Sequence, residues 1–363
     1  MKIVIVSRAI PHIGGREVII EYLIEDLKKN HPILLLTSDT DIKRKGIKTV
    51  DIDQNSEKLE KILREFKPDL INCHTFYFFN LVKNLSKALN IPLVFTLHGM
   101  FLRFYGKDYT SIIGRICDES DAVTVVARNY KKELIFRFGV KSRNIHVIRN
   151  GIPHSLLNKA ESSLSKLRFD IPPEKKLVVV PARINKVKGL EYLIGAAKKM
   201  EKDNFFFLVC SPLGRHDERE DALKQKLLKS FSSSNTPVRF GEFSHSDLQK
   251  IFNISDVCLL PSLMEGISIS ILEAMEGNCF IITTNVGGNS EVIKNGKNGY
   301  LIRPKNSKDI VDALRKFDRL PLEKKRKMTD NAKKTVRTHF SKKEMIRLYQ
   351  NLFSNIVKKY ENK

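Results

Sequence analysis

The chain has 363 residues, of which 42% are hydrophobic and 29% charged; this excludes a disordered protein and is long enough for two domains of ordinary size. Its 64 Lys and Arg against 41 Asp and Glu give a net charge of +23, which a nucleic acid, an anionic membrane surface or a polyanionic substrate would each explain. Because lysine is spread over nearly every predicted helix, ordinary solvated charge is an equal alternative. No apolar run approaches the roughly 20 residues that span a bilayer.

The opening residues, MKIVIVSRAI, are basic and then apolar, as at the start of a signal peptide. The apolar run is too short and no small-residue cleavage site follows it. We therefore interpret it as a buried first strand and expect a cytoplasmic protein. The five cysteines are scattered without a CxxC pair, four of them in apolar stretches, which predicts buried thiols and neither disulfides nor a zinc site.

The first half of the chain alternates short β-branched runs with amphipathic helical windows. Strands are predicted at 2–7, 33–37, 47–52, 69–73, 92–97, 122–126 and 145–148, with helices between most of them. Continuous apolar strands that alternate with helices predict a parallel sheet covered on both faces.

A stretch at 152–176 with several Pro and Ser is a linker candidate, and the alternation restarts after it. Strands are predicted at 176–182, 205–210, 237–240, 256–262, 279–284 and 300–302, and about 306–362 reads as helices alone. The predicted fold class is α/β, with two tandem Rossmann-like doubly wound domains. Ligands of such sheets bind at the carboxyl ends of the strands, so we expect the site in a cleft between the domains.

Loops at the predicted strand ends carry residues that suit a phosphate or a sugar. Gly14 and Gly15 follow the first strand, but the chain has neither GxGxxG nor a Walker A sequence, which argues against a simple dehydrogenase. His98 lies at a strand tip, where it is either a ligand contact or a satisfied loop histidine. Arg183 and Lys188 flank the first strand–helix loop of the second domain, where cations suit a diphosphate.

The segment EGISISILE places Glu265 in a loop after a strand and Glu273 on a helix. Eight helical positions span roughly 12 Å, which is more than the ~5–10 Å that separates paired catalytic carboxylates, so separate roles are indicated. The N–H groups of Gly266 to Ser268 would open a helix N-terminus that suits an anion. The later sequence GGNSE predicts a tight turn with Asn289 or Ser290 as the N-cap.

Together these stretches resemble family GT4 of the GT-B fold glycosyltransferases (glycosyl transferases group 1, retaining). The resemblance covers nearly the full chain in order, and its specific part runs from Pro261 to Leu301. The motifs that carry it are Gly14-Gly15, His98-Gly99, Asn150-Gly151-Ile152, Arg183…Lys188-Gly189, Pro261-Ser262-x-x-Glu265-Gly266, Glu273-Ala274-Met275, Gly287-Gly288…Glu291-Val292-Ile293 and Asn298-Gly299-Tyr300-Leu301.

The resemblance implies a hexosyltransferase that moves a sugar, with retention of configuration, from a nucleotide diphospho-sugar to a glycan or lipid-linked acceptor in cell-surface polysaccharide synthesis. It implies that no metal or other cofactor is required, and a UDP-sugar is favoured over a GDP-sugar as donor. A nucleic-acid partner is not expected. Two alternatives remain: a nucleotide-sugar epimerase of the same fold, which needs no acceptor, and a basic nucleic-acid-binding protein.

The same resemblance assigns roles to individual residues. The catalytic residues would be His98, Glu265, Arg183 and Lys188. The donor contacts would be Gly14, Gly15, Arg183, Lys188, Glu265, Gly266, Ile267, Ser268 and Glu273. Arg183 and Lys188 would hold the diphosphate, Glu273 the ribose, and Glu265 the donor sugar. Ile267 stands where members usually have the aromatic residue of EGFGL.

The resemblance also divides the chain into an acceptor-binding domain at 1–157, a nucleotide-sugar domain at 158–338 and a C-terminal helix at 339–363 that packs back on the first domain. Two basic, aromatic-rich segments, 101–107 and 128–144, suit docking on an anionic membrane face. An ordinary amphipathic helix with a solvated face is an equal alternative for them.

Overall fold

The computed structural model describes residues 1–8, 14–38, 45–99, 102–154, 166–169, 171–213, 218–232 and 238–362. The chain forms two compact units, one of Met1–Asn150 with Lys342–Lys363 and one of Gly151–Ser341. The boundary predicted at 157/158 lies outside the described residues, as does much of the linker candidate. The boundary predicted at 338/339 falls in the last turn of helix α12 (Leu322–His339), shortly before the chain leaves the second unit.

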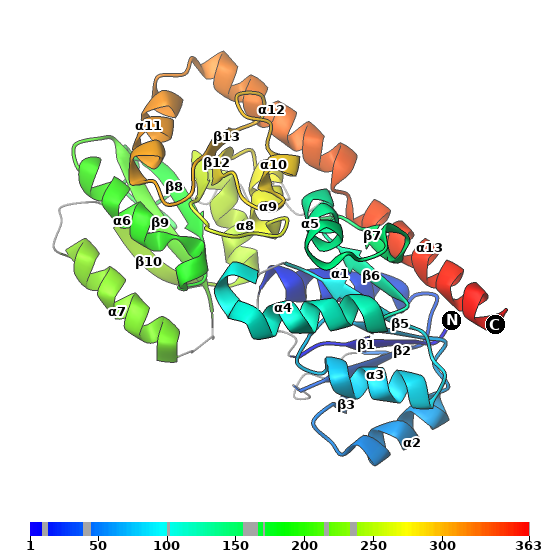
Figure 1. Ribbon diagram of the computed structural model, residues 1–363. Coiled ribbons are helices and arrows are strands. Elements are labelled where there is room, and N and C mark those ends of the chain that lie inside the picture. Colours follow the sequence, from blue (N-terminus) through cyan, green and yellow to red (C-terminus); the bar gives the residue numbers. More distant parts are fainter. Residues whose placement is uncertain are drawn as a thin grey trace. The chain divides into compact units, whose positions relative to one another are not determined.

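The first unit is built on a seven-stranded parallel sheet of order β3-β2-β1-β4-β5-β6-β7 (Figure 1). Every residue of the central strands is buried, which explains their continuous apolar runs. The strands are β1 (Ile3–Val6), β2 (Ile33–Thr37), β3 (Lys48–Asp51), β4 (Leu70–Cys73), β5 (Leu93–Leu97), β6 (Ala122–Val125) and β7 (Ile145–Val147). The helices are α1 (Gly15–Leu27), α2 (Ser56–Phe66), α3 (Phe79–Ala88), α4 (Leu102–Glu119), α5 (Arg128–Phe138) and α13 (Lys342–Glu361).

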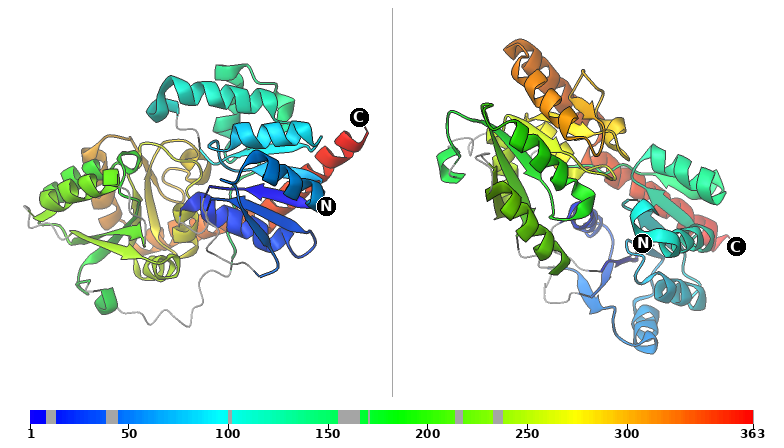
Figure 2. Two further views of the ribbon diagram at one scale, coloured as in Figure 1. Left: turned by 90° about the horizontal axis from the view of Figure 1, so that it is seen from below. Right: turned by 60° about the vertical axis from the view of Figure 1, so that its left-hand side comes forward.

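Helix α13 returns to the first unit and packs beside α1 (Figure 2). Lys342 forms a 3.0 Å ion pair with Asp26 at the end of α1. The buried hydroxyl of Tyr349 is hydrogen-bonded to Thr96 and Thr124, which lie on β5 and β6. The C-terminal helix therefore completes the layer that covers this face of the sheet.

The second unit is built on a six-stranded parallel sheet of order β10-β9-β8-β11-β12-β13. The strands are β8 (Lys176–Pro181), β9 (Phe205–Pro212), β10 (Val238–Phe243), β11 (Val257–Leu260), β12 (Phe280–Thr284) and β13 (Tyr300–Ile302). Helices α6 (Leu190–Lys199), α7 (Glu218–Ser232) and α11 (Ser307–Asp318) pack together, and α8 (His245–Ile254) and α12 each pack on α9 (Ile269–Glu276). The prediction of two doubly wound α/β domains with C-terminal helices is confirmed.

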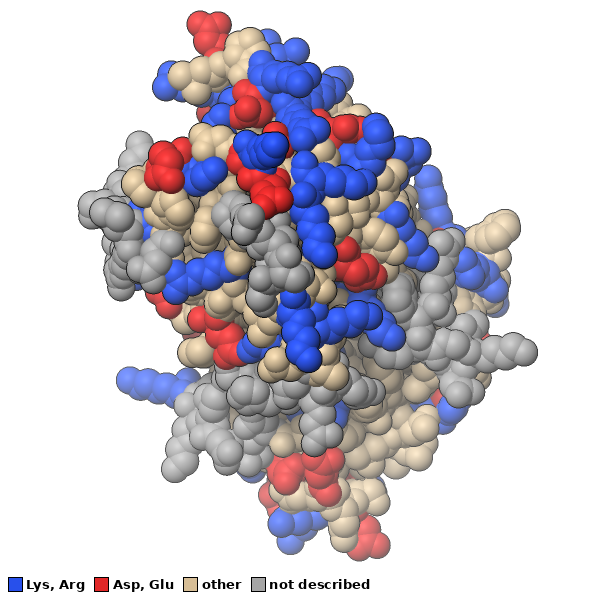
Figure 3. Space-filling view, turned by 90° about the vertical axis from the view of Figure 1, so that its left-hand side faces the viewer, with Lys and Arg blue, Asp and Glu red and all other residues tan. Residues whose placement is uncertain are grey.

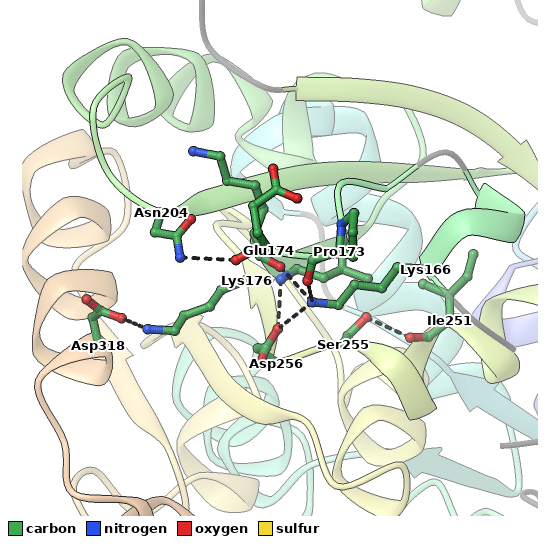
Figure 4. Close-up of polar contacts among 11 residues, drawn as sticks. Lys166, Pro173, Glu174, Lys176, Asn204, Ile251, Ser255, Asp256 and Asp318 are labelled. Carbon is green, nitrogen blue, oxygen red and sulfur yellow. Dashed lines mark hydrogen bonds and ion pairs between the residues drawn. The ribbon is translucent and has the colours of Figure 1, made fainter. Parts of the chain in front are cut away.

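A polar network closes the amino edge of this second sheet (Figure 4). Asp256, just before β11, accepts the backbone N–H of Leu177 on β8 at 2.8 Å and lies 3.9 Å from Lys166 Nζ. Lys176 pairs with Asp318 at the end of α11. Lys166 and Lys176 thus pair with carboxylates of the protein itself, so their presence does not indicate a ligand site.

The face of the molecule shown in Figure 3 carries charges of both signs. On the face shown in Figure 3, Asp and Glu lie among the many Lys and Arg. Arg315, for example, pairs with Asp203 at 3.0 Å. The cysteines are buried, and burial raises the pKa of Cys73 and of Cys117 to about 12. Within the described residues, no helix is both long and apolar enough to cross a membrane.

Candidate active site

The predicted donor residues of the second unit follow the two strands at which its strand order reverses. The chain runs outward from β8 to β10 and then returns to place β11 on the other side of β8. Open α/β sheets bind ligands at such a switch point, beyond the carboxyl ends of the strands. Arg183 and Lys188 follow β8, and Glu265 follows β11, so sequence and topology single out the same position.

Gly189 allows the loops after β8 and β11 to touch. Its φ is +62°, and an added Cβ would lie 2.3 Å from the carbonyl oxygen of Pro261. The backbone N–H of Leu263 donates to the carbonyl of Val187 at 2.7 Å. No side chain larger than hydrogen fits between these two backbones without displacing one of them. The glycine thus sets the distance between the loops that carry Lys188 and Glu265.

Lys188 and Glu265 form a nearly buried ion pair at this contact. The Nζ atom of Lys188 lies 2.5 Å from Oε1 of Glu265, and the two side chains are 17% and 10% exposed. Ser262 Oγ donates to the same carboxylate oxygen at 2.7 Å, and Thr284 Oγ1 in turn donates to the carbonyl of Ser262 at 2.5 Å. An ammonium group has three donors, so Glu265 orients Lys188 and leaves N–H groups of the ammonium for a further anion.

Glu273 contacts a different residue, His245. The Nε2 atom of His245 lies 2.6 Å from Oε1 of Glu273, whose side chain is 3% exposed. Burial lowers the pKa of His245, but the hydrogen bond and the charge of Glu273 raise it by more, so the net shift is upward. The structure thus gives Glu265 and Glu273 separate partners, in line with the separate roles inferred from their spacing.

Sequence reasoning missed His245. It is the first residue of α8, and Ser244 precedes it as an N-cap whose Oγ accepts from the N–H of Asp247 at 3.1 Å. The sequence offered one indication of His245: it directly follows a capping serine after β10. The end of β10 lies at the carboxyl edge of the same sheet.

Helix α9 begins at Ile269 with Ser268 as its N-cap residue, slightly later than expected. The carbonyl of Gly266 accepts the backbone N–H of Gly288 at 2.9 Å, so the glycine loop after β12 supports the loop after β11 that carries Glu265. The side chain of Ile267 is 3% exposed, which leaves little of its surface for a ligand.

The prediction that Asn289 or Ser290 caps α10 (Asn289–Val292) is wrong. Gly288 holds that position without a side-chain cap. Asn289 is fully buried and donates instead to Thr283 Oγ1 at 2.9 Å and to the carbonyl of Thr284 at 3.2 Å. The amide therefore donates to groups at the end of β12 and does not cap the helix. An unpaired acceptor costs more free energy when it is buried, as these two are, than at an exposed helix end.

In the first unit, Gly14, Gly15 and His98 also lie at the carboxyl edge of their sheet. Gly14 is the extended N-cap residue of α1, and Gly15 is its first residue. His98 follows β5, and its Nε2 lies 2.8 Å from Nδ1 of His74, which follows the adjacent strand β4. Sequence reasoning missed His74, although its position directly after a predicted strand was visible.

The second-unit arrangement can bind an anion and a polyol together. Lys188 and Arg183 supply positive charge, and Glu265 and Glu273 supply hydrogen-bond acceptors. Within the described part of the chain, no three His, Cys, Asp or Glu side chains come together as a metal site. The residues so arranged suit a ligand with both phosphate and hydroxyl groups.

Comparison with known proteins identifies the family. The model of "Glycosyl transferases group 1" matches residues 165–335, and that of "Glycosyltransferase Family 4" matches residues 13–156. The chain is 23% identical to N-acetyl-alpha-D-glucosaminyl L-malate synthase of Bacillus anthracis, over 100% of this chain and 99% of the relative. It is 28% identical to an uncharacterised glycosyltransferase of Methanocaldococcus jannaschii, over 70% of this chain and 68% of the relative.

The fold comparison agrees. Anabaena HepE, solved in complex with UDP and glucose, superposes with a TM-score of 0.86 at 16% identity, over 98% of this chain and 100% of that chain. The two family models lie one on each predicted domain and together span most of the sequence. This chain is therefore a GT-B glycosyltransferase of the GT4 type.

Proposed function

We propose that this glycosyltransferase transfers a hexosyl group from a nucleotide diphospho-sugar, with a UDP-sugar as the preferred donor, to a glycan or lipid-linked acceptor in cell-surface polysaccharide synthesis. The observation that carries the proposal is the Lys188–Glu265 pair at the switch point of the second sheet, with Arg183 in the same loop as Lys188. The complex of HepE with UDP and glucose supports the choice of nucleotide.

In the proposed reaction, the bond between the anomeric carbon and the diphosphate oxygen breaks, and a bond from the acceptor oxygen to the same carbon forms on the same face. The acceptor's proton goes to the departing phosphate oxygen, so no protein nucleophile is required. Arg183 and Lys188 stabilise the negative charge that develops on the leaving diphosphate, and we propose that they do so without a metal cofactor. Glu273 holds the ribose, and Glu265 holds both Lys188 and the donor sugar.

Thermal unfolding in the presence of UDP-, GDP- and ADP-sugars tests this donor site. We expect one nucleotide class, UDP, to raise the Tm of the wild type and to have no effect on Arg183→Ala. A matched control is Arg303→Ala, because Arg303 is exposed and pairs only with Asp309 among the described residues. An equal response from wild type and Arg183→Ala, or no response from wild type to any nucleotide sugar, would contradict the site.

We further propose that α5 brings the enzyme to an anionic bilayer, where a lipid-linked acceptor resides. Phe136 is 91% exposed, and its neighbour Ile135 is exposed as well. Residues 128–143 carry six Lys and Arg and one Glu, a net charge of 6 − 1 = +5, and most of these cations are exposed. An exposed aromatic ring among cations suits the interface of an anionic membrane. The side chains of the other basic segment, 101–107, lie outside the described residues.

Co-sedimentation with vesicles distinguishes docking through Phe136 from attraction by the positive charge alone. Burying one phenylalanine contributes about 1.5–3 kcal/mol, which is roughly tenfold to hundredfold in partitioning. Phe136→Ser should lower binding to vesicles with phosphatidylglycerol by about that factor. Leu322→Ser should not, although Leu322 is 63% exposed, because it lies on α12 in the other unit. Equal binding by both variants would contradict the docking surface.

A further inference from the structure

Three neighbouring strands of the first unit end in polar residues that leave buried atoms unpaired. Ser7 follows β1, His74 follows β4 and His98 follows β5, and the strand order reverses between β1 and β4. Among the described residues, Ser7 Oγ, His74 Nε2 and His98 Nδ1 have no hydrogen-bond partner. An unpaired buried polar atom costs about 1–3 kcal/mol. Three such atoms at one switch point therefore indicate a ligand that completes them.

The two histidines are linked by the contact between their remaining nitrogens. His74 Nδ1 and His98 Nε2 lie 2.8 Å apart, and the backbone N–H of His74 donates to the carbonyl of Val6 at 2.9 Å, which fixes His74 against β1. A neutral imidazole has one N–H and one bare nitrogen. The shared hydrogen bond therefore needs the N–H from one ring and the bare nitrogen from the other.

This requirement couples the outer atoms of the pair. If His74 Nδ1 carries the shared proton, His98 Nδ1 is an N–H donor and His74 Nε2 is an acceptor. If His98 Nε2 carries it, the two outer atoms exchange roles. A neutral pair thus always presents one donor and one acceptor. Burial, followed by the charge of Arg16, lowers the pKa of His74 to about 3, and burial, His74 and Arg16 lower that of His98 well below its ordinary value.

We propose that His74 is a positioning residue that ties the tautomer of His98 to its own, and that the pair presents a matched donor and acceptor to the hydroxyl groups of a sugar. An anion only accepts hydrogen bonds, so it would leave the acceptor end unpaired, whereas a hydroxyl both donates and accepts. The assignment of a sugar as ligand rests on the proposed function. The tautomeric coupling depends on the geometry of the pair alone.

The test uses ¹⁵N-histidine-labelled full-length protein and two variants. His74→Phe keeps a ring but removes the hydrogen bond, while His74→Asn places an amide near the position of Nδ1. In the wild type we expect His74 and His98 to show the same tautomer as each other in ¹⁵N–¹H correlation spectra, because one shared proton makes both rings Nδ1–H or both Nε2–H. In His74→Phe we expect a mixture of tautomers, and a kcat for sugar transfer at least about tenfold lower with little change in donor KM.

His74→Asn should restore most of the rate, because its amide can again hydrogen-bond to His98 Nε2, whereas a purely structural role would not require that hydrogen bond. The control is His146→Phe, because His146 lies on β7 away from β4 and β5 and should leave the spectrum of His98 unchanged. An unchanged His98 tautomer in His74→Phe would overturn the proposal. The spectra can be recorded without any transfer reaction. A wild type without transferase activity would therefore contradict the proposed function, while the spectra would still test the coupling of the two histidines.

Discussion

Replacing Lys188 by Met would remove the ammonium group that pairs with Glu265 while keeping an unbranched apolar side chain at that position. Breaking a buried ion pair by removing one partner costs roughly 3–5 kcal/mol. The side chains here are 17% and 10% exposed, so residual water screens part of that cost. We expect about 2–4 kcal/mol of lost unfolding free energy.

A double-mutant cycle separates the pair from its surroundings. Glu265→Gln alone should lower the free energy of unfolding by about 1–2 kcal/mol, because the ammonium group of Lys188 loses its charged partner. The loss stays small because Ser262 can still donate to the oxygen of the new amide. The double variant, with both Lys188→Met and Glu265→Gln, should lose about 1–2 kcal/mol less than the sum of the two single losses, since it contains neither charge of the pair.

Urea unfolding followed by circular dichroism measures all three variants. The matched control is Lys308→Met, whose partner Asp312 forms an exposed pair with side chains 75% and 57% accessible. That variant should lose less than about 0.5 kcal/mol. Single effects at Lys188 and Glu265 that add to within about 0.5 kcal/mol would refute the coupling inferred from the 2.5 Å contact.

Three further predictions concern backbone contact and proton linkage. Gly189→Ala should destabilise the second unit by at least about 2 kcal/mol in thermal unfolding, from left-handed strain and from the clash with the Pro261 carbonyl; an unchanged Tm would contradict the close approach. Folding favours the neutral form of His74, so its contribution to stability should fall by about 1.4 kcal/mol per pH unit as the pH drops from about 6.5 towards about 3. In urea titrations His74→Phe should remove this share of the slope, while His98, whose pKa is also lowered, keeps its own. The raised pKa of His245 means that its pairing stabilises the fold below pH 6.5 and that this contribution is lost as the pH rises through the folded-state pKa; Glu273→Gln should lower that pKa in an NMR titration, and an unchanged value would exclude the pair as its cause.

The sequence predicts the two-sheet architecture because parallel strands buried on both faces read as unbroken apolar runs. The runs at 2–7 and 256–262, for example, contain β1 and β11. It also predicts the edge at which the site lies, since ligands of such sheets bind at the carboxyl ends of the strands. Only the family resemblance assigned residues of the loops after β8 and β11 to one donor, because strand order is not visible in local patterns.

Contacts between distant loops were not predictable in the same way. Lys188 and Glu265 are 77 positions apart, and their pairing depends on β11 returning beside β8. His74 and His245 were missed because each looks like one more polar residue after a strand, and only the folded neighbours, His98 and Glu273, give them a role. The cap at Asn289 was predicted wrongly for a related reason: its amide satisfies buried acceptors that local sequence does not reveal.

Calorimetric titration of UDP and UDP-sugars into wild type and Lys188→Met measures whether the donor diphosphate binds at the switch point of the second sheet. We expect wild type to bind, and Lys188→Met to bind at least about tenfold more weakly, because it loses one charge-assisted contact of roughly 1.5–3 kcal/mol. Lys308→Met should bind as wild type does. Equal affinities for wild type and Lys188→Met would contradict binding of the diphosphate at this position.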